Sequence, residues 1–266
     1  MLIIGELING MYQKVARAIQ QKDADCIKSL ARQQVQAGAD ALDVNCGPAS
    51  RDVISDMRWL VETIQEEVSA ILSLDSTKPQ AIEEGLKVAR NKAIINSSTA
   101  DIEKLEVYVP LAKKYHSSLI ALTMDKKGVP QDKDRRLELA AQILGFAQEN
   151  DFSASEIYLD PIVLPVNVAQ NQLLSILEVI KDFKMISTSA PKTVVGLSNI
   201  SQGSKDRSLI NRTFLVMAQG YGLDAAILDP LDQELMDALI TAELILNKNI
   251  YCNSYIEAYK KSKVSR

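Results

Sequence analysis

The strongest constraint on the fold is a regular alternation of short apolar runs with longer helical patterns. The runs are rich in Ile, Val and Leu, and their flanking Gly, Pro, Asn and Asp residues favour strands over buried helix segments. They lack polar alternation, which is typical of parallel strands covered on both faces. The predicted strands are residues 2–5, 41–45, 71–74, 93–95, 118–123, 156–159, 193–197 and 224–228.

The segments between these runs have helical periodicity and helix boundary signals. In the first of them Ile27, Ala31 and Gln34 share one side, and Gly38 ends the helix. The predicted helices are residues 25–38, 52–68, 79–90, 101–116, 133–149, 171–182, 206–220 and 231–247.

The number of these units predicts the architecture. Eight strand–helix units in 266 residues average about 33 residues each, a normal length for such a unit. The simplest closed arrangement is an α/β protein with a single (β/α)8 TIM barrel, in which residues 1–266 form one domain. A doubly wound open sheet is the alternative, but the first turn, residues 5–10, is no G-x-G-x-x-G motif.

Charge and cysteine content restrict the class of protein. The chain holds 30 basic and 34 acidic residues, a net charge of −4, whereas a nucleic-acid groove needs a basic surplus. No apolar run approaches the roughly 18 residues of a membrane span, and the N-terminus lacks the basic region of a signal peptide. Cys26, Cys46 and Cys252 fit neither a disulfide framework nor a zinc knuckle. We therefore expect a cytoplasmic protein that binds neither nucleic acid nor membrane.

Polar side chains follow nearly every predicted strand. In a barrel the active site lies at the carboxyl ends of the strands, so these side chains would surround one mouth. Any single one is explained as well by a turn or a helix N-cap. Together they form a ring of acids and amides, which suits a neutral polar heterocycle better than a phosphate. The ring consists of Glu6, Asn45, Asp75, Asn96, Asp125, Asp160, Ser198, Asn199 and Asp229.

An aminopyrimidinone matches this ring chemically. Its exocyclic NH2 and ring N–H groups match the two oxygens of one carboxylate, and a neighbouring Asn can donate and accept along the remaining edge. Side chains of those types come from three predicted strand ends, as Asp75, Asn96 and Asp160.

Other chemistry lacks the residues it needs. The single histidine, His116, is predicted at the end of a helix, where a surface position is the simplest interpretation. Cys46 ends a strand, but a lone buried cysteine is usually inert. The sequence has no Ser-His-Asp set, Walker loop or zinc ligand set, so we expect no bound metal. We also expect no His, Lys or acid of raised pKa to serve as a general acid.

Five segments at the strand ends carry a resemblance to a known family. They are residues 74–77, 95–97, 159–170, 196–202 and 211–226, of which Gly-Leu-Ser-Asn at 196–199 is the most specific. Over essentially its whole length the chain resembles the folate–corrinoid methyltransferases of the pterin-binding barrel superfamily. It is most similar to the methyltetrahydrofolate:corrinoid iron–sulfur protein methyltransferases of acetogenic bacteria.

The resemblance implies a binding site for the pterin ring. It implies that Asp75, Asn96 and Asp160 hold the pyrimidine edge and that Asn199 lies beside N5 of the folate. Further positions that line the family's pterin pocket correspond to Gly196, Ser198, Gln202 and Ile227.

The resemblance also implies the reaction and the partner. It implies a homodimeric methyltransferase of one-carbon metabolism that uses tetrahydrofolate or 5-methyltetrahydrofolate as substrate and a corrinoid (cobalamin-type) cofactor on a separate protein. His116 lies in Lys-Tyr-His-Ser-Ser-Leu, which does not match the corrinoid-binding Asp-x-His-x-x-Gly loop. The zinc ligands of methionine-forming relatives are missing too, so the chain resembles the folate half only, with homocysteine excluded as a direct acceptor.

The chemistry of N5 is consistent with the residues present. N5-methyl-folate is a poor leaving group unless N5 gains a proton or a strong hydrogen bond. A neutral amide such as that of Asn199 can stabilise the protonated amine by accepting a hydrogen bond that strengthens in the transition state. Water and nearby carboxylates would carry the proton. A simple turn residue after the strand is the alternative interpretation of Asn199.

Some alternatives stay open. The first strand reads Gly5 to Asn9 with Leu7 where many relatives have Arg, and related demethylation enzymes run the transfer from methyl-corrinoid to tetrahydrofolate, so the direction is open. A dihydropteroate synthase-like enzyme would need cations for pyrophosphate, for which Lys78, Lys192 and Arg207 are candidates. A non-catalytic pterin-binding module would use the same ring. A barrel lyase would hold a divalent metal on Asp75, Asp160 and Asp229.

Overall fold

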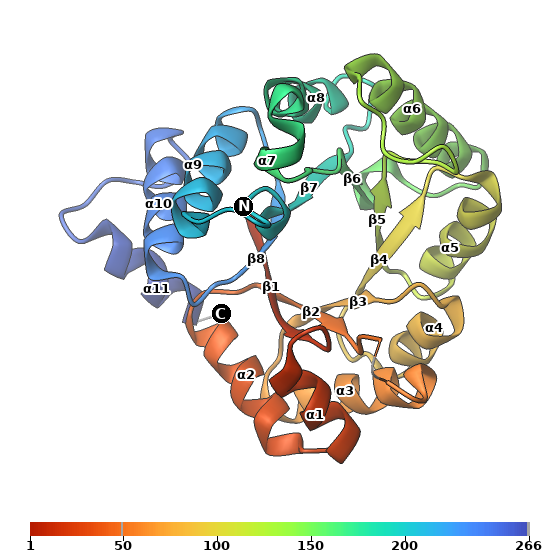
Figure 1. The fold of residues 1–266 in the computed structure, drawn as a ribbon, viewed down its shortest axis with the longest axis vertical. Helices are drawn as coiled ribbons and strands as arrows, with labels where there is room; N and C mark the ends of the chain where they lie inside the picture. Colours follow the sequence, from red (N-terminus) through yellow and green to blue (C-terminus); the bar gives the residue numbers. More distant parts are fainter. Residues whose placement is uncertain (49, 265–266) are drawn as a thin grey trace.

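The parallel strands close into a barrel. In the computed structural model, which describes residues 1–48 and 50–264, eight strands pair in chain order and β8 pairs with β1 (Figure 1). This confirms the predicted (β/α)8 barrel and each of the predicted strands. The strands are β1 (Leu2–Asn9), β2 (Ala41–Asn45), β3 (Ile71–Asp75), β4 (Ile94–Thr99), β5 (Ser118–Leu122), β6 (Ile157–Asp160), β7 (Lys192–Gly196) and β8 (Ala225–Leu228).

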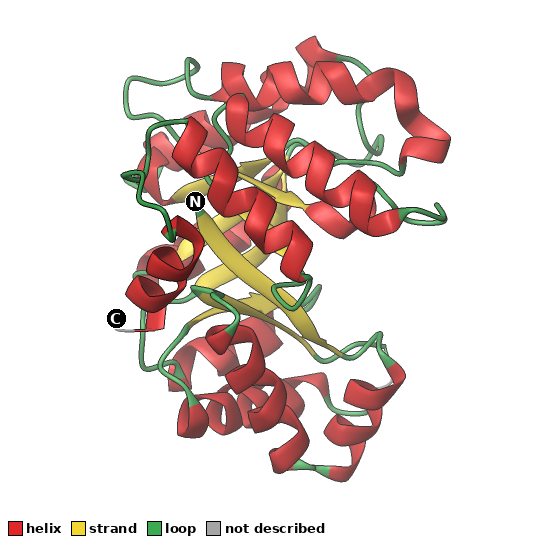
Figure 2. Cartoon of the chain, turned by 90° about the vertical axis from the view of Figure 1, so that its left-hand side faces the viewer, coloured by secondary structure: helices red, strands yellow, loops and turns green. Residues whose placement is uncertain are grey.

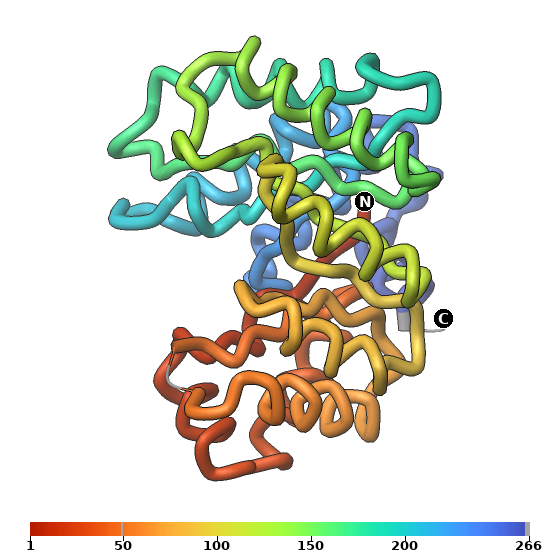
Figure 3. Tube along the Cα trace, turned by 90° about the vertical axis from the view of Figure 1, so that its right-hand side faces the viewer, coloured from red at the N-terminus to blue at the C-terminus, as the bar shows by residue number. Residues whose placement is uncertain are grey.

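A layer of helices surrounds the barrel. Figure 3 shows α1 to α4, in red to orange, in the lower part of the view and α6 to α8, in green to cyan, in the upper part, with α5 between them. The helices are α1 (Gln13–Gln21), α2 (Ala24–Gln36), α3 (Val53–Glu67), α4 (Pro79–Val88), α5 (Ile102–Lys114), α6 (Lys133–Glu149), α7 (Val166–Ala169), α8 (Leu173–Phe183), α9 (Arg207–Gly220), α10 (Gln233–Ile245) and α11 (Tyr255–Val264), with short 3-10 turns η1 (Ala154–Glu156), η2 (Gln170–Gln172) and η3 (Leu197–Asn199). The predicted helices are confirmed, whereas α1, α7 and α11 were not expected from the sequence.

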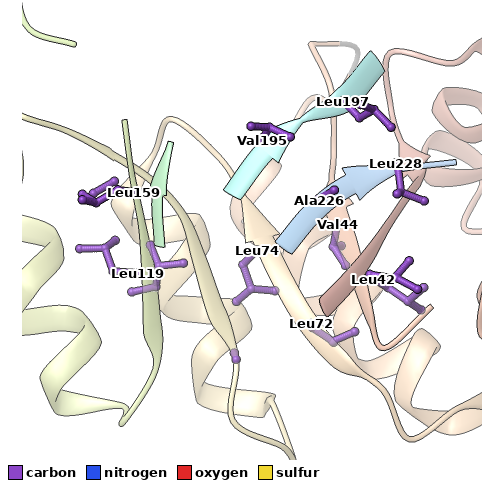
Figure 4. Packing of buried hydrophobic residues seen from close by; sticks show 14 of the residues in the cluster. Leu42, Val44, Leu72, Leu74, Leu119, Leu159, Val195, Leu197, Ala226 and Leu228 are labelled. Atoms are coloured by element: carbon purple, nitrogen blue, oxygen red, sulfur yellow. The ribbon is translucent and has the colours of Figure 1, made fainter. Parts of the chain in front are cut away.

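Successive residues of each strand face two different environments. Leu42 and Val44 of β2 belong to the large core between strands and helices (Figure 4). Ala41 belongs to a second buried cluster, which is built from strand residues and therefore fills the barrel interior. Side chains along each strand thus alternate between the helix layer and the barrel interior. The sequence does not show this alternation, because both faces of the strands are buried and apolar.

Several helices begin at an aspartate whose side chain caps the first turn. Asp23, Asp52, Asp132 and Asp232 each accept a hydrogen bond from the backbone N–H three residues later. Such a cap satisfies one of the unpaired N–H groups of the first turn. Pro79 is the first residue of α4, where it has no N–H to leave unpaired.

Two strands are longer than predicted, which changes the position of two polar residues. β1 continues to Asn9 with a register shift after Gly5, so Glu6 lies within the strand and not beyond its end. β4 continues to Thr99 with a register shift after Asn96. Asn96 is therefore paired in the sheet with Asp75 of β3 and Ile120 of β5, whereas Glu6 lies at the register shift of β1.

The chain termini lie at the amino end of the barrel. Lys263 of α11 forms an ion pair with Asp40, whose other oxygen accepts from Ile3 N at the start of β1. Figure 2 shows the start of β1 and α11 on the same side of the molecule. The Met1 ammonium group pairs with Glu243 of α10. Across the described ranges, no helix combines the length and the apolar character needed to cross a membrane.

Candidate functional site

The barrel interior changes from apolar to polar toward the carboxyl ends of the strands. Ile4, Ile94, Ile120 and other apolar side chains fill the amino half. Two residues further along the same strands, Glu6 and Asn96 follow at inward-facing positions, because strand side chains alternate with a period of two. The apolar half therefore forms the floor of a polar mouth.

The mouth contains an Asp–Asn pair on neighbouring strands. Asn45 and Asp75 are register partners, and Asn45 Nδ2 donates to Asp75 Oδ2 at 2.6 Å. Asn45 Oδ1 accepts from Gly47 N at 2.6 Å, so both polar atoms of this amide have partners within the protein. Burial raises the pKa of Asp75, and the hydrogen bond from Asn45 opposes that shift.

Asp43 is a buried carboxyl group that sequence reasoning missed. Its side chain accepts from Ser73 Oγ at 2.7 Å and from Asn96 Nδ2 at 3.0 Å. The residue is 4% exposed, and burial together with the nearby Asp75 charge raises its pKa. The sequence did contain a signal, since Asp43 lies two residues before Asn45 and must share its face of the strand.

Asp160 lies at the end of β6 in a nearly closed environment. Its Oδ1 accepts from Ile162 N at 2.7 Å, and its carbonyl oxygen accepts from both N and Oγ1 of Thr123 at 2.9 Å. Burial raises the pKa of Asp160 to about 7. The expectation that the site has no acid of raised pKa is therefore wrong, because the sequence did not reveal how completely this carboxyl group is enclosed.

The turn after β7 places two further polar side chains at the mouth. Ser198 Oγ donates to Glu6 Oε1 at 2.7 Å, which joins η3 to β1. A Cβ atom on Gly196 would lie 2.9 Å from Asn199 Nδ2, so the absence of a side chain at 196 leaves room for that amide. Burial raises the pKa of Glu6, and the Ser198 hydrogen bond opposes the shift.

The remaining predicted residues, Ile227, Gln202 and Asp125, differ in their exposure and in the groups that they contact. Ile227 of β8 packs against the apolar cluster of the barrel interior, next to Gly196 in the sheet. Gln202 has an exposed side chain, and its backbone N–H donates to Asn199 O at 3.2 Å. Asp125 pairs with Arg135 at 2.6 Å and with Lys127 N, so it is engaged in its own loop.

Two cavities open at this end of the barrel. One of about 440 Å³ is lined by Glu6, Tyr12, Ser198, Arg207 and Asp229 among others. The second, of about 410 Å³, is lined by Asn45, Asp75 and the residues around Lys78. The polar mouth thus has open space beside both β1 and β3.

A cation lines the first cavity. Arg207 Nε donates to Ser201 Oγ at 3.2 Å and its NH2 group to the Ser198 carbonyl at 3.4 Å. Lys192, in contrast, begins β7 at the opposite end of the barrel, with its Nζ 4.9 Å from the centre of the Tyr158 ring. Of the predicted cations, Arg207 lines the first cavity and Lys78 lines the second, whereas Lys192 lies away from the mouth.

The other reactive side chains are placed as the sequence suggested. His116 is exposed, directly after the C-cap of α5. Cys46 is 1% exposed, and burial raises the pKa of its thiol to about 12, which disfavours the reactive thiolate. Within residues 1–48 and 50–264, no three His, Cys, Asp or Glu side chains form a group that could hold a metal ion, including the three carboxylates of the metal-dependent alternative.

Comparisons with known sequences place the chain among pterin proteins. A family model described as "Pterin binding enzyme" matches residues 5–229. A methylcorrinoid:tetrahydrofolate methyltransferase of Eubacterium limosum is 29% identical over 266 residues, covering 99% of this chain and 98% of that protein. Methionine synthase of Mycobacterium tuberculosis is 26% identical over 239 residues, which are 85% of this chain and 20% of that protein. The chain therefore spans about a fifth of the length of that second relative.

Comparisons with solved structures agree on the fold. A dihydropteroate synthase of Coxiella burnetii, solved in complex with pteroic acid, superposes with a TM-score of 0.72 at 15% identity, covering 93% of this chain and 94% of that chain. The dihydropteroate synthase of Vibrio fischeri ES114 gives a TM-score of 0.67 at 16% identity, covering 94% of both chains. At such low identity the likeness concerns the barrel alone.

Proposed function

The chain belongs to the family of pterin-binding enzymes, and on that premise we propose that it transfers a methyl group between N5 of a folate and the cobalt of a separate corrinoid protein. One observation carries the proposal. Asp75, Asn96 and Asp160 occupy one end of the barrel in a chain that aligns over nearly its whole length with a methylcorrinoid:tetrahydrofolate methyltransferase. The name of that relative supports transfer from the methylcorrinoid to tetrahydrofolate, and we propose this direction.

The three residues match the pyrimidine edge of a pterin. Two carboxyl groups, Asp75 and Asp160, offer acceptors to the exocyclic NH2 and ring N–H donors of that edge. Asp160 is buried and Asp75 partly buried, so leaving their oxygens unpaired beside a ligand would be costly and a matching N–H donor is favoured. Gly196, Ser198, Gln202 and Ile227 complete the proposed pterin site.

We assign Asn199 to N5. In the proposed direction the N5 lone pair forms the bond to the methyl carbon, the carbon–cobalt bond breaks with its electron pair left on cobalt, and the N5 proton leaves to water or a carboxylate. The Asn199 amide oxygen stabilises positive charge on N5 by accepting its N–H hydrogen bond. Burial raises the pKa of Glu6, which makes this carboxyl group a suitable carrier for the proton.

The partner must reach N5 from above the strand ends. We propose that the loops at the carboxyl ends of the strands form the face that meets the corrinoid protein, because the methyl group moves there. We also propose that residues 1–266 are one pterin-binding barrel domain and that the protein is a homodimer. A sedimentation mass near the 29.3 kDa of one chain would contradict the dimer.

Two measurements test the proposed function. Calorimetric titration with tetrahydrofolate and with 5-methyltetrahydrofolate should show binding, and no heat at millimolar ligand would exclude the pterin site. Incubation with methylcobalamin and tetrahydrofolate should yield 5-methyltetrahydrofolate, detected by mass spectrometry. Formation of dihydropteroate from a dihydropterin pyrophosphate and p-aminobenzoate would support the synthase alternative instead. Lys192 is remote from the mouth, but Arg207 and Lys78 line its two cavities, so the dihydropteroate assay decides between the two functions.

Replacement of Asn199 separates catalysis from binding. Asn199→Ala is expected to lower the methyl-transfer rate on the order of a hundredfold, because one oriented contact to the transition state is lost. Tetrahydrofolate affinity should change by less than about threefold, since the carboxylates hold the ring. A rate within twofold of the unmodified protein would remove Asn199 from this role.

A further inference from the structure

The amide of Asn96 is held in one orientation by a buried acceptor. Its Nδ2 donates to Asp43 Oδ1 at 3.0 Å, and the acceptor side chain is 4% exposed. A carboxylate cannot donate, so this contact requires the amide nitrogen to face Asp43. Among residues 1–48 and 50–264, nothing donates a hydrogen bond to Asn96 Oδ1, which remains available to a ligand.

This orientation persists whether or not the carboxyl group is protonated. Ser73 Oγ donates to the same oxygen, Asp43 Oδ1, at 2.7 Å. Because both donors converge on Oδ1, a proton would reside on Oδ2, and Oδ1 would still accept. The other amide on these strands, Asn45, has both polar atoms engaged with Asp75 and Gly47. Of these two amides, Asn96 is therefore the one that can form a hydrogen bond with a ligand through its oxygen.

The free edge of a pterin differs between its oxidation states. Beyond the 2-amino group, a reduced pterin presents N1 as an acceptor and N8–H as a donor. An amide matches both, because one N–H donates to N1 and the oxygen accepts from N8–H. In a fully oxidised pterin N8 has no hydrogen, so the same amide oxygen meets a lone pair.

We propose that Asp43 is a positioning residue that, by fixing the Asn96 amide, makes the site select reduced pterins over fully oxidised ones. The inference rests on the proposed function and adds a residue that contacts no substrate. Asn96 cannot turn its oxygen away from an oxidised N8 without giving up its bond to Asp43. The preference for reduced pterins thus comes from the repulsion between the fixed Asn96 oxygen and the N8 lone pair of an oxidised pterin.

The test compares the affinities of tetrahydrofolate and fully oxidised folate. The unmodified protein should prefer tetrahydrofolate by about tenfold or more, the effect of one mismatched buried polar group. In Asp43→Ala, tetrahydrofolate should bind about tenfold more weakly, because the amide must now be ordered on binding. Folate affinity should stay constant or rise, since the freed amide can rotate. Dihydrofolate, which keeps N8–H, should follow tetrahydrofolate.

Ser73→Ala is the matched control, because it removes the other hydrogen bond to the same oxygen. It should keep the preference for reduced pterins within about threefold. A general loss of structure in Asp43→Ala would weaken both ligands alike, so the ratio of affinities distinguishes positioning from damage. If the alanine variant does not fold cooperatively, Asp43→Ser, whose hydroxyl is too short to reach Asn96, takes its place.

The outcomes separate the two proposals. A preference in the unmodified protein that survives in Asp43→Ala would overturn the role of Asp43 and leave the proposed function standing. Equal affinity of the unmodified protein for both ligands would also overturn it. Failure of the unmodified protein to bind either ligand would refute the proposed pterin site and the role of Asp43 with it.

Discussion

At the scale of single residues, the polar mouth is built from acids whose pKa values are raised by burial. Asp43, Asp75 and Asp160 all have raised pKa values because the barrel encloses them. Burying an ionised carboxylate without a cation is expensive, so enclosure shifts each acid toward its neutral form. A ligand that donates N–H groups reverses this preference, since it pairs with the ionised form.

The pKa of Asp160 predicts how stability changes with pH. Its value rises from 3.8 to about 7 on folding, so between those values the folded state holds a proton that the unfolded state has released. The contribution of Asp160 to the free energy of unfolding is therefore fully present below about pH 4 and is lost as the pH rises through 7. The loss amounts to about 1.4 kcal/mol for each unit by which the two pKa values differ. Asp160→Asn should therefore raise the free energy of unfolding at pH 8 by about 2–4 kcal/mol.

Urea denaturation at pH 5 and pH 8 measures this effect. The gain in Asp160→Asn should be clearly smaller at pH 5 than at pH 8. Asp134→Asn on the exposed face of α6 is the control and should alter neither value by more than about 0.5 kcal/mol. Equal gains at both pH values would contradict the raised pKa.

The sequence predicted the positions of most residues of the mouth, but it did not predict the raised pKa values of their carboxyl groups. Asp75, Asn96 and Asp160 could be predicted because each ends or nearly ends an apolar run. Asp43 was missed because it sits inside a run whose two faces are both buried, which concealed the alternation. The raised pKa of Asp160 depends on how completely distant segments enclose it, and no local pattern reports that.

At the scale of elements, short turns determine where the mouth residues point. η3 follows β7 directly, and Gly196 at the junction leaves room for the Asn199 amide. The loop after β6 is fixed in a different way. The buried Arg136 of α6 donates from Nε to Pro161 O at 2.9 Å and from NH2 to Gln172 Oε1 at 2.9 Å. A helix of the outer layer thus holds the turn beside Asp160.

Gly196→Ala should impair catalysis by displacing the Asn199 amide. The added methyl group would lie 2.9 Å from Asn199 Nδ2, so the amide must move. The methyl-transfer rate should fall at least about tenfold, because a small misplacement of a transition-state contact is costly. Gly145→Ala in α6, where no atom lies within 4 Å of the new Cβ, is the control and should retain full activity. Full activity in both variants would show that the amide need not lie where it does.

Arg136→Met should destabilise the protein through the loop after β6. The variant leaves the Pro161 carbonyl without its donor, and it should lower the free energy of unfolding by about 2–3 kcal/mol. Arg135→Met removes a more exposed ion pair with Asp125 and should cost less than about 1 kcal/mol. Urea denaturation measures the free energy of unfolding of both variants. Equal decreases would show that the buried Arg136 stabilises the protein no more than the exposed Arg135.

Most elements could be predicted from the sequence, and the exceptions have physical reasons. The strands were found because runs of Ile, Val and Leu filled both faces of the sheet. α1 was missed although Val15, Ala18 and Ile19 have helical spacing, because a nine-residue segment is too short for its periodicity to stand out. The extension of β1 to Asn9 was missed because a register shift after Gly5, which the sequence does not announce, carries the strand onward.

At the scale of the whole molecule, the two ends of the barrel have separate tasks. The carboxyl ends of the strands carry the proposed site. The amino end is covered by α11, whose Tyr255 and Tyr259 pack on the core and whose Lys263 pairs with Asp40. The apolar floor of the barrel lies between them, so changes at one end should not reach the other.

Removal of residues 254–266 should test that separation. The truncated protein should be less stable, because partly buried aromatic side chains and the ion pair to Asp40 are lost. Tetrahydrofolate affinity and methyl-transfer rate, measured well below the unfolding temperature, should stay within about twofold. A large loss of affinity in a folded truncated protein would show that the two ends are coupled.

The enclosure of Asp160 has a consequence for the heat of ligand binding. When a pterin pairs its N–H donors with Asp160, the carboxyl group ionises. At about pH 6 the released proton is taken up by the buffer. The apparent binding enthalpy should then differ between phosphate and an amine buffer by a fraction of the difference in their ionisation enthalpies. That fraction counts the protons released, so calorimetry reports the charge of a side chain that is almost fully enclosed.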